Sequence, residues 1–319
     1  MDYKRYVFFR DDDVQRLDER FLSFFKLFMK NKIPIVYGII PGRIDNKCAR
    51  FLLNQKIKNP DLIDLAQHGW SHKNYSDKNI NKFEFGPGRV YIDQKIDIIN
   101  GFLKMHELFG RDFSKIFIPP FHSYNFDTLK IINFLSERGN LNIFSAGSKT
   151  IQKEKKFIDL PASINFLPSQ NNKKNKYVKR TLALLKKLFQ NNSTSGILFH
   201  HDKYDAKDME AIDKFLKYLK NLKTVSTFLP SKILKNKKNN KIDLTIEVTN
   251  RCNLHCKVCD IWREKPKKFL SFKETQQIFL TLLKSYSIGS VSLTGGEPFL
   301  NPELAKIVSY LTVLKKTKK

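Results

Sequence analysis

Short apolar runs alternate with amphipathic helical patterns along the first 230 residues, and this alternation restricts the chain to a few folds. The apolar runs, which we expect to be buried strands, lie at 4–9, 33–40, 62–67, 114–118, 141–146, 196–200 and 224–228. The helical patterns lie at 15–31, 92–109, 125–138, 177–191 and 206–222. Because the crossovers between parallel strands are usually helices, the alternation predicts an α/β fold with a parallel sheet, open or closed into a barrel.

A stretch rich in lysine and asparagine, residues 232–241, interrupts this rhythm. It has almost nothing to bury, so we expect a solvated linker. After it come a strand at 242–248, a cysteine-rich loop, a helix from about 272, a strand at 291–295 and a helix from 302. The predicted organisation is therefore a domain over 1–231, a linker over 232–241 and a second domain over 242–319.

The charge balance is strongly basic, with 58 Lys and Arg against 31 Asp and Glu and a formal net charge of +27. Lys, Asn, Ile and Phe are abundant together, as AT-rich coding would produce, and the basic residues lack the aromatic interleaving typical of nucleic-acid recognition. We therefore expect no specific nucleic-acid partner, although an anionic substrate remains compatible with the charge. No apolar run approaches the ~18 residues of a spanning helix, and the N-terminus does not resemble a secretory signal. The sequence thus predicts a cytoplasmic protein.

Acidic and histidine side chains follow three of the predicted strands at the point where each strand ends. Ligand sites of parallel α/β sheets form at these carboxyl ends. The residues concerned are Asp11, Asp12 and Asp13 after the first strand, His68 and His72 after the third, and His200 and His201 after the sixth. A rigid Pro-Pro turn follows strand 114–118. Taken alone, the three aspartates could equally cap a helix and the histidines could be surface residues.

Together these residue types indicate metal-assisted hydrolysis. His68 and His72 are four apart, a spacing that brings two imidazoles onto one side of a helical turn, where they can share one metal ion. A carboxylate and two imidazoles make a three-ligand zinc site with an open position. One further carboxylate and one further histidine then supply a base and an acid.

The order of these motifs resembles the polysaccharide deacetylase family. RDDDV (10–14) is similar to its paired-aspartate motif and HGWSH (68–72) to its His-x-x-x-His motif. FIPPFHSYN (117–125) is similar to its Arg-Pro-Pro-Tyr motif and ILFHHD (197–202) to its Leu-x-His motif. The resemblance covers residues 4–230 and implies a distorted (β/α) barrel of seven strands. It also implies hydrolysis of an N-acetylated sugar or glycoconjugate.

The resemblance assigns a role to each residue of this predicted site. Asp13, His68 and His72 would bind a divalent metal, with zinc the first expectation, and Asp12 would be the base that deprotonates the attacking water. His200 would be the acid that protonates the leaving amine, with His201 as the alternative because the doubled histidine leaves the register open by one. The backbone N–H of Phe121 would help to hold the oxyanion.

Two positions depart from the family pattern. The arginine that usually precedes Pro-Pro and orients the catalytic aspartate is Ile118 here, and the usual tyrosine is Phe121. Because the oxyanion donor is a backbone amide, it survives the change from tyrosine to phenylalanine. Arg10 lies close to Asp12 in the sequence, and the sequence does not show whether it substitutes for the missing arginine.

A second motif follows strand 242–248, where Cys252, Cys256 and Cys259 lie within eight residues. Three thiolates so close can bind three irons of a [4Fe–4S] cluster and leave the fourth iron open. Zinc is the alternative, but it normally takes four ligands, and His255 lies too near its neighbours to complete a usual set. The remaining cysteine, Cys48, is expected to be a small core residue.

This cysteine motif, followed one βα unit later by Gly295-Gly296-Glu297-Pro298, resembles the start of a radical S-adenosylmethionine (AdoMet, or SAM) enzyme. The resemblance implies that the cysteines hold the cluster, that the open iron binds AdoMet, and that the Gly-Gly-Glu-Pro turn contacts its amino group. Residues 242–319 correspond to about two βα units of a barrel that normally has six, so we expect a truncated domain unable to perform radical chemistry.

Three functions are thus open at this stage. The first is a metal-dependent deacetylase fused to a partial radical SAM domain. In the second, the radical SAM part is the functional centre and the N-terminal barrel is an accessory. In the third, the barrel binds carbohydrate without catalysis. The sequence gives no oligomeric state.

Overall fold

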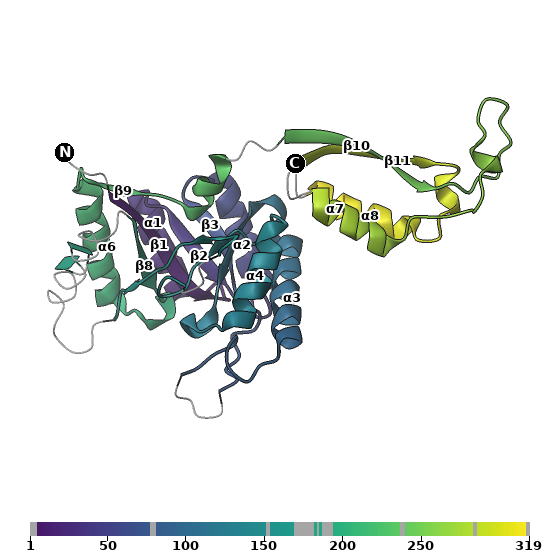
Figure 1. Ribbon diagram of the computed structural model, residues 1–319. Coiled ribbons are helices and arrows are strands. Elements are labelled where there is room, and N and C mark those ends of the chain that lie inside the picture. The colour runs from purple at the N-terminus through teal and green to yellow at the C-terminus, as the bar shows by residue number, and fades with distance from the viewer. Residues whose placement is uncertain are drawn as a thin grey trace. The chain divides into compact units, whose positions relative to one another are not determined.

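The chain divides into two compact units, unit 1 (Met1–Asn236) and unit 2 (Lys237–Lys319) (Figure 1). The computed structural model describes residues 5–76, 81–150, 154–168, 182–183, 185–186, 194–236, 240–282 and 286–316. In these segments no helix combines the length and apolar character that crossing a membrane would require.

Unit 1 is built on a curled parallel sheet. Its strands are β1 (Arg5–Val14), β2 (Ile35–Ile39), β3 (Ile63–His68), β4 (Phe113–Ile118), β5 (Ile143–Phe144), β6 (Ile158–Asp159), β7 (Ile164–Asn165), β8 (Thr194–Phe199) and β9 (Val225–Thr227). Their order is β6-β5-β4-β3-β2-β1-β8-β7, with β9 also paired to β1. This confirms the predicted α/β class, with a distorted, barrel-like sheet.

Helices cover the convex face of this sheet (Figure 1). They are α1 (Glu19–Asn31), α2 (Asn46–Lys58), α3 (Tyr91–Phe109), α4 (Phe126–Glu137) and α6 (Ala206–Asn221). The first begins at Glu19 rather than at residue 15, because the side chain of Asp18 caps it by accepting a hydrogen bond from the N–H of Phe21 at 2.8 Å. The helix expected over 177–191 lies almost entirely outside the described residues.

The two faces of the sheet have different cores. On the convex face, strand residues such as Val7 and Phe9 pack against helix residues such as Phe24. On the concave face, Phe8 and Leu198 belong to a separate apolar cluster drawn from the strands and the segments that follow them. Because successive strand residues point to opposite faces, the residue number along each strand decides which face a polar side chain reaches.

The strand β1 continues to Val14, five residues beyond the predicted end at residue 9. The three aspartates therefore lie inside the strand, and the alternative that they cap a helix is wrong, since Asp18 caps α1. The strands β6 and β7 were not predicted, because two residues are too few to show a periodicity.

The structure also differs from the predicted linker. Pro230–Asn236 forms a short 3-10 segment, and Leu234 packs against the concave cluster. The backbone N–H of Ser231 donates to Asp64 at 2.9 Å. Asn240 already begins the next strand. The stretch expected to be a solvated linker over 232–241 is thus partly folded at both ends.

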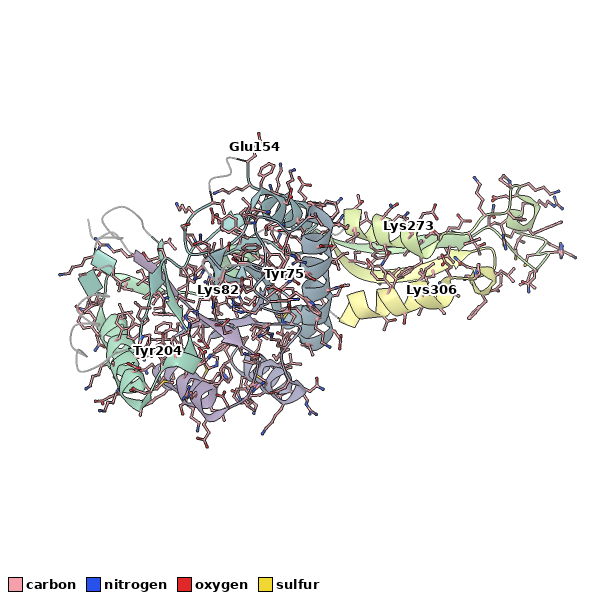
Figure 2. All side chains as sticks on the ribbon, turned by 90° about the horizontal axis from the view of Figure 1, so that it is seen from below. Tyr75, Lys82, Glu154, Tyr204, Lys273 and Lys306 are labelled. Atoms are coloured by element: carbon pink, nitrogen blue, oxygen red, sulfur yellow. The ribbon has the colours of Figure 1, made fainter. Side chains whose placement is uncertain are left out.

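Unit 2 contains a pair of parallel strands, β10 (Asn240–Thr249) and β11 (Tyr286–Gly295), and two helices, α7 (Phe272–Leu282) and α8 (Leu304–Lys316). Its small core is formed by Phe279, Ile288, Ile307 and Leu311. Figure 2 labels Lys273 on α7 and Lys306 on α8, both of which are exposed. The order of strand, cysteine loop, helix, strand and helix agrees with the sequence prediction.

Candidate functional site

An irregularity at the end of β1 turns two adjacent aspartates toward the same side. Regular alternation would place Arg10 and Asp12 on the concave face with Phe8, and Asp11 and Asp13 on the opposite face. The pairing of β1 with β2 shifts register between Asp11 and Val14, and Asp13 has a φ of 65°, a left-handed conformation that aspartate tolerates. Asp13 consequently joins Asp12 at the concave side of the strand end.

Asp13 lies between the two histidines that follow β3. Its Oδ1 is 3.2 Å from Nε2 of His68 and 3.0 Å from Nε2 of His72. The three ligand atoms lie within 4.8 Å of one another. The expectation that a helical turn brings the histidines together is wrong: His68 is the last residue of β3, and His72 lies in a loop with a φ of 53°.

This donor set fits a divalent metal ion. Nδ1 of His68 lies 3.2 Å from the carbonyl oxygen of Ile118, which can only accept a hydrogen bond. Nδ1 therefore donates to this carbonyl and orients Nε2 toward Asp13, where Nε2 would bind an ion once the ion displaces its proton. Burial raises the pKa of Asp13, but its hydrogen bonds with His68 and His72 outweigh this and hold the pKa well below its usual value. Two imidazoles and an ionised carboxylate suit zinc among other divalent ions.

Asp12 is held by a fully buried arginine. Nη2 of Arg10 donates a hydrogen bond to Oδ2 of Asp12 at 3.0 Å, and Nε lies 2.9 Å from Oδ1. Nη1 of Arg10 donates to the backbone carbonyl of Ser145 at 2.5 Å and to its hydroxyl at 2.8 Å. Burial raises the pKa of Asp12, but the Arg10 charge more than offsets it, so the carboxyl pKa lies below its ordinary value. Asp12 is thus an ionised hydrogen-bond acceptor at neutral pH.

A glycine on the neighbouring strand makes room for Asp12. A Cβ atom at Gly38 of β2 would lie 2.8 Å from Oδ1 of Asp12 and 3.1 Å from Cδ1 of Ile118. Ile118, where the family pattern has arginine, therefore borders the same space as Asp12. Arg10 reaches the aspartate from its own strand instead.

The two adjacent histidines after β8 lie on opposite faces of the sheet. Nε2 of His200 lies 4.0 Å from Oδ2 of Asp13. His201 is buried on the convex side, where its Nδ1 lies 2.9 Å from Oδ2 of Asp11 and its backbone N–H donates to Oδ1 at 3.0 Å. Its ring also packs against Phe21. His200 is therefore the histidine that faces the candidate metal ligands, and the alternative that His201 is the acid does not fit this geometry.

The buried pair of Asp11 and His201 is separate from the candidate site. Burial raises the pKa of the Asp11 carboxyl to about 6, and the nearby imidazole opposes this shift. The Asp11 carboxylate raises the pKa of His201 despite its burial. The hydroxyl of Tyr204, a residue labelled in Figure 2, accepts a hydrogen bond from the N–H of His200 at 3.3 Å.

Glu84 is a site residue that sequence analysis missed. Its buried carboxylate accepts hydrogen bonds from the backbone N–H groups of Ser71 at 2.7 Å, His72 at 3.1 Å and Trp70 at 3.3 Å. Burial raises the pKa of Glu84, while these N–H groups lower it. The contacts fix the loop that carries His72. No motif signals this role, because the acceptor lies twelve residues away along the chain.

Phe121 lies beside the candidate metal ligands. It has a φ of 56° in the short turn after β4, and its ring centroid is 4.3 Å from that of His72. The structure thus brings the predicted oxyanion segment to the same place as Asp13 and His72. That the Phe121 N–H holds an oxyanion remains a prediction.

The cysteine loop of unit 2 begins directly after β10. Cys252 is half-buried, whereas Cys256 and Cys259 are exposed, and all three are free thiols. The N–H of Leu254 lies 3.4 Å from Sγ of Cys252. Within the described part of the chain, the three sulfurs do not all lie within 4.8 Å of one another, as the ligand atoms of the Asp13 group do. A four-iron cluster bonds each thiolate to a different iron, so its ligands are spaced more widely than those of a single ion.

The turn Gly295–Pro298 lies against the start of this loop. The N–H of Gly296 donates to the carbonyl of Thr249 at 2.7 Å, and the N–H of Glu297 donates to that of Arg251 at 2.7 Å. A Cβ atom at Gly296 would lie only 2.1 Å from the Arg251 carbonyl oxygen, so a larger residue cannot approach as closely. The two sequence motifs of unit 2 are thus adjacent in space.

Comparison with known families identifies this part of the chain. The Radical SAM superfamily model matches residues 246–319. Unit 2 carries a radical SAM domain. A Saccharolobus islandicus protein named as a GTP 3',8-cyclase is 38% identical over 72 residues, which cover 23% of each chain. A Listeria welshimeri GTP 3',8-cyclase is 33% identical over 86 residues, or 24% of each chain. The chain thus spans about a quarter of the length of these relatives.

Solved structures identify the fold of the larger part. A Mycobacterium smegmatis protein assigned as a polysaccharide deacetylase superimposes with a TM-score of 0.54 at 13% sequence identity. The match covers 73% of this chain and 90% of that protein. The chain has the polysaccharide deacetylase fold. Both predicted resemblances are therefore confirmed at the level of fold and domain.

The role of Glu84 predicts a change in metal affinity. Glu84→Gln keeps the shape of the side chain but removes the charge that accepts three backbone N–H groups, so the loop carrying His72 should lose its fixed geometry. We expect zinc affinity to fall about 10–100-fold, measured by competition with a chromophoric chelator. The control is Glu107→Gln on the exposed side of α3, which should bind zinc like the unmodified protein. Equal affinities in both variants would contradict the role.

Proposed function

We propose that unit 1 is a metal-dependent hydrolase that removes the acetyl group from an N-acetylated sugar or glycoconjugate. One observation carries the proposal: Asp13, His68 and His72 present three ligand atoms within 4.8 Å, and Asp12 and His200 border the same place. The site lies at the carboxyl ends of parallel strands, where ligand sites of such sheets form.

Asp13, His68 and His72 would hold the metal, with zinc the first expectation. A bound divalent ion would polarise the acyl carbonyl group and make water a stronger nucleophile. The hydrogen bond from Nδ1 of His68 to the Ile118 carbonyl orients Nε2 for this purpose.

Asp12 would act as the base. Its carboxylate is ionised and buried, so it can accept a proton from the attacking water. Arg10 limits the rotation of the carboxylate by binding it along one edge. Gly38 leaves the space around Oδ1 unfilled by a side chain.

His200 would act as the acid. As the water oxygen bonds to the acyl carbon and the C–N bond breaks, the leaving nitrogen needs a proton, and His200 is an imidazole near Asp13 that is not one of the three candidate metal ligands. Burial lowers the pKa of His200, which makes its protonated form a stronger proton donor. The Phe121 N–H would stabilise negative charge on the acyl oxygen. The products are acetate and the free amine.

The choice of an N-acetylated sugar rests on the motifs RDDDV, HGWSH, FIPPFHSYN and ILFHHD, which resemble those of polysaccharide deacetylases. The fold shared with the Mycobacterium smegmatis protein, which is assigned as a polysaccharide deacetylase, also supports this choice. The net charge of +27 is compatible with an anionic glycoconjugate.

For unit 2 we propose that Cys252, Cys256 and Cys259 hold a [4Fe–4S] cluster and that AdoMet binds against Gly295–Pro298. The match to the Radical SAM superfamily and the contact between the two motifs support this. The reaction named for the relatives is not carried over, because the chain spans about a quarter of their length. The alternatives for unit 1 are an accessory barrel of a radical enzyme and a carbohydrate-binding barrel without catalysis.

Metal content tests the first site. Purified without oxygen, the full chain should contain about one equivalent of zinc or a similar divalent ion per unit 1. His72→Ala should lose it, because one of three protein ligands is removed, whereas His106→Ala on α3 should retain it. Elemental analysis measures both. A protein without divalent metal, or equal loss in the two variants, would favour the carbohydrate-binding alternative.

The role of Asp12 separates binding from turnover. Asp12→Asn should keep the metal but lower acetate release from tri-N-acetylchitotriose by about 10²–10⁴-fold, because the amide cannot accept a proton. Asp202→Asn, an exposed neighbour of the site histidines, serves as the control and should hydrolyse the trimer normally. Undiminished turnover in Asp12→Asn would remove this residue from the role of base.

Iron content tests unit 2. After anaerobic reconstitution the chain should carry about four irons together with the broad visible absorbance of a [4Fe–4S] cluster. Cys256→Ala should lose both, since a cluster ligand is removed, while Cys48→Ala in unit 1 should not. Retention of the cluster in Cys256→Ala would show that the motif is not its binding site.

A further inference from the structure

His122 is a histidine near the candidate site to which no role has been assigned. It follows Phe121 in the turn after β4, and both residues have a positive φ, 56° for Phe121 and 57° for His122. Such conformations are uncommon for bulky residues and are retained where surrounding contacts hold them. The His122 ring is half-buried, and its Nδ1 lies 3.4 Å from Nη2 of Arg10.

The contact with Arg10 determines which ring nitrogen of His122 carries the proton. A guanidinium group has five N–H donors and no acceptor. Nδ1 of His122 must therefore accept, so the proton of the neutral ring is on Nε2. Burial lowers the pKa of His122 to about 4, and the adjacent Arg10 charge acts in the same direction. The ring is thus neutral near pH 7.

The orientation of the Arg10 guanidinium toward His122 is fixed by its contacts with Asp12 and Ser145. Asp12 lies along one edge of the guanidinium, and the carbonyl and hydroxyl of Ser145 accept hydrogen bonds from Nη1. Arg10 itself is completely buried. The same guanidinium therefore fixes the ionised Asp12 on one side and the neutral His122 on another.

The other nitrogen of His122 is available to a ligand. The ring is only half-buried, and among the described residues no hydrogen bond to Nε2 is found. The ring lies close to the backbone at Gly147, where a Cβ would be 3.2 Å from Cγ of His122. Arg10 contacts both His122 and Asp12, and His122 directly follows Phe121, whose ring centroid is 4.3 Å from that of His72, so His122 borders the candidate site.

We propose that His122 is a substrate-binding residue whose Nε2–H donates a hydrogen bond to an acceptor oxygen of the bound substrate, with Arg10 fixing the tautomer. This inference rests on the proposed function of unit 1, and the acceptor is a carbonyl or hydroxyl oxygen of the N-acetylated sugar. An uncharged donor suits a site that would also hold a divalent cation, because it adds no positive charge beside the ion.

The tautomer is tested by NMR on the full chain with ¹⁵N-labelled histidine. Between pH 6 and pH 8, we expect Nδ1 of His122 to remain unprotonated and Nε2 to remain protonated. His122→Gln assigns the signals. The internal control is His106, whose pKa burial also lowers to about 4 but which packs against Phe102 and Phe113 instead of Arg10. A proton on Nδ1 of His122, or a charged ring at pH 7, would overturn the inference without touching the proposed hydrolysis.

Substrate contact is tested with tri-N-acetylchitotriose and the zinc-loaded protein. Addition of the trimer should move the His122 Nε2–H signal and leave His106 unchanged. In His122→Phe the KM for the trimer should rise about tenfold, the effect of one lost hydrogen bond, while kcat stays within about twofold and zinc content is unchanged. His122→Gln, which keeps an N–H donor, should recover part of the loss.

The outcomes distinguish the two proposals. If the trimer is hydrolysed but neither the His122 signal nor the KM of His122→Phe changes, the substrate contact is wrong and the deacetylase proposal stands. If no site histidine responds to the trimer and no acetate is released, the proposed function and the substrate contact fail together.

Discussion

The candidate site depends on one buried arginine. A charge removed from water is costly unless it is paired, and Arg10 is paired with Asp12 and also contacts Ser145 and His122. These partners come from β1 and from the segments after β4 and β5. The guanidinium therefore connects β1 with the segments after β4 and β5. Its charge also lowers the pKa of Asp12 and of His122.

Three consecutive aspartates have three different environments because of the strand geometry. Asp11 points to the convex side and pairs with His201 under the helices. Asp12 points to the concave side and pairs with Arg10. Asp13 would follow Asp11 in a regular strand, but the register shift and left-handed backbone bring it to His68 and His72. Strand alternation thus separates Asp11 from Asp12, the candidate base. The local irregularity brings Asp13, the candidate metal ligand, to the same side as Asp12.

Several long helices follow from sequence pattern alone, whereas the helix α2 and the strands β6 and β7 were not predicted. Helices such as α3 and α6 begin and end within a residue of their predicted bounds, since more than three turns give a clear period. The two-residue strands β6 and β7 have no period to detect, and they exist because neighbouring strands pair with them. The extension of β1 to Val14 likewise depends on pairing, because three charged residues do not indicate a strand.

The sequence by itself determined which candidate site residues the chain carries and in what order, because acids and histidines follow predicted strands of the first domain and the cysteines follow a predicted strand of the second. The tertiary structure alone decided which of these residues face one another. The sequence does not distinguish the roles of His200 and His201, whereas the structure places them on opposite faces of the sheet. Arg10 contacts Ser145, which is distant along the chain, and Glu84 contacts the backbone of His72, although no motif includes Glu84. Such contacts are set by tertiary packing rather than by the local sequence pattern.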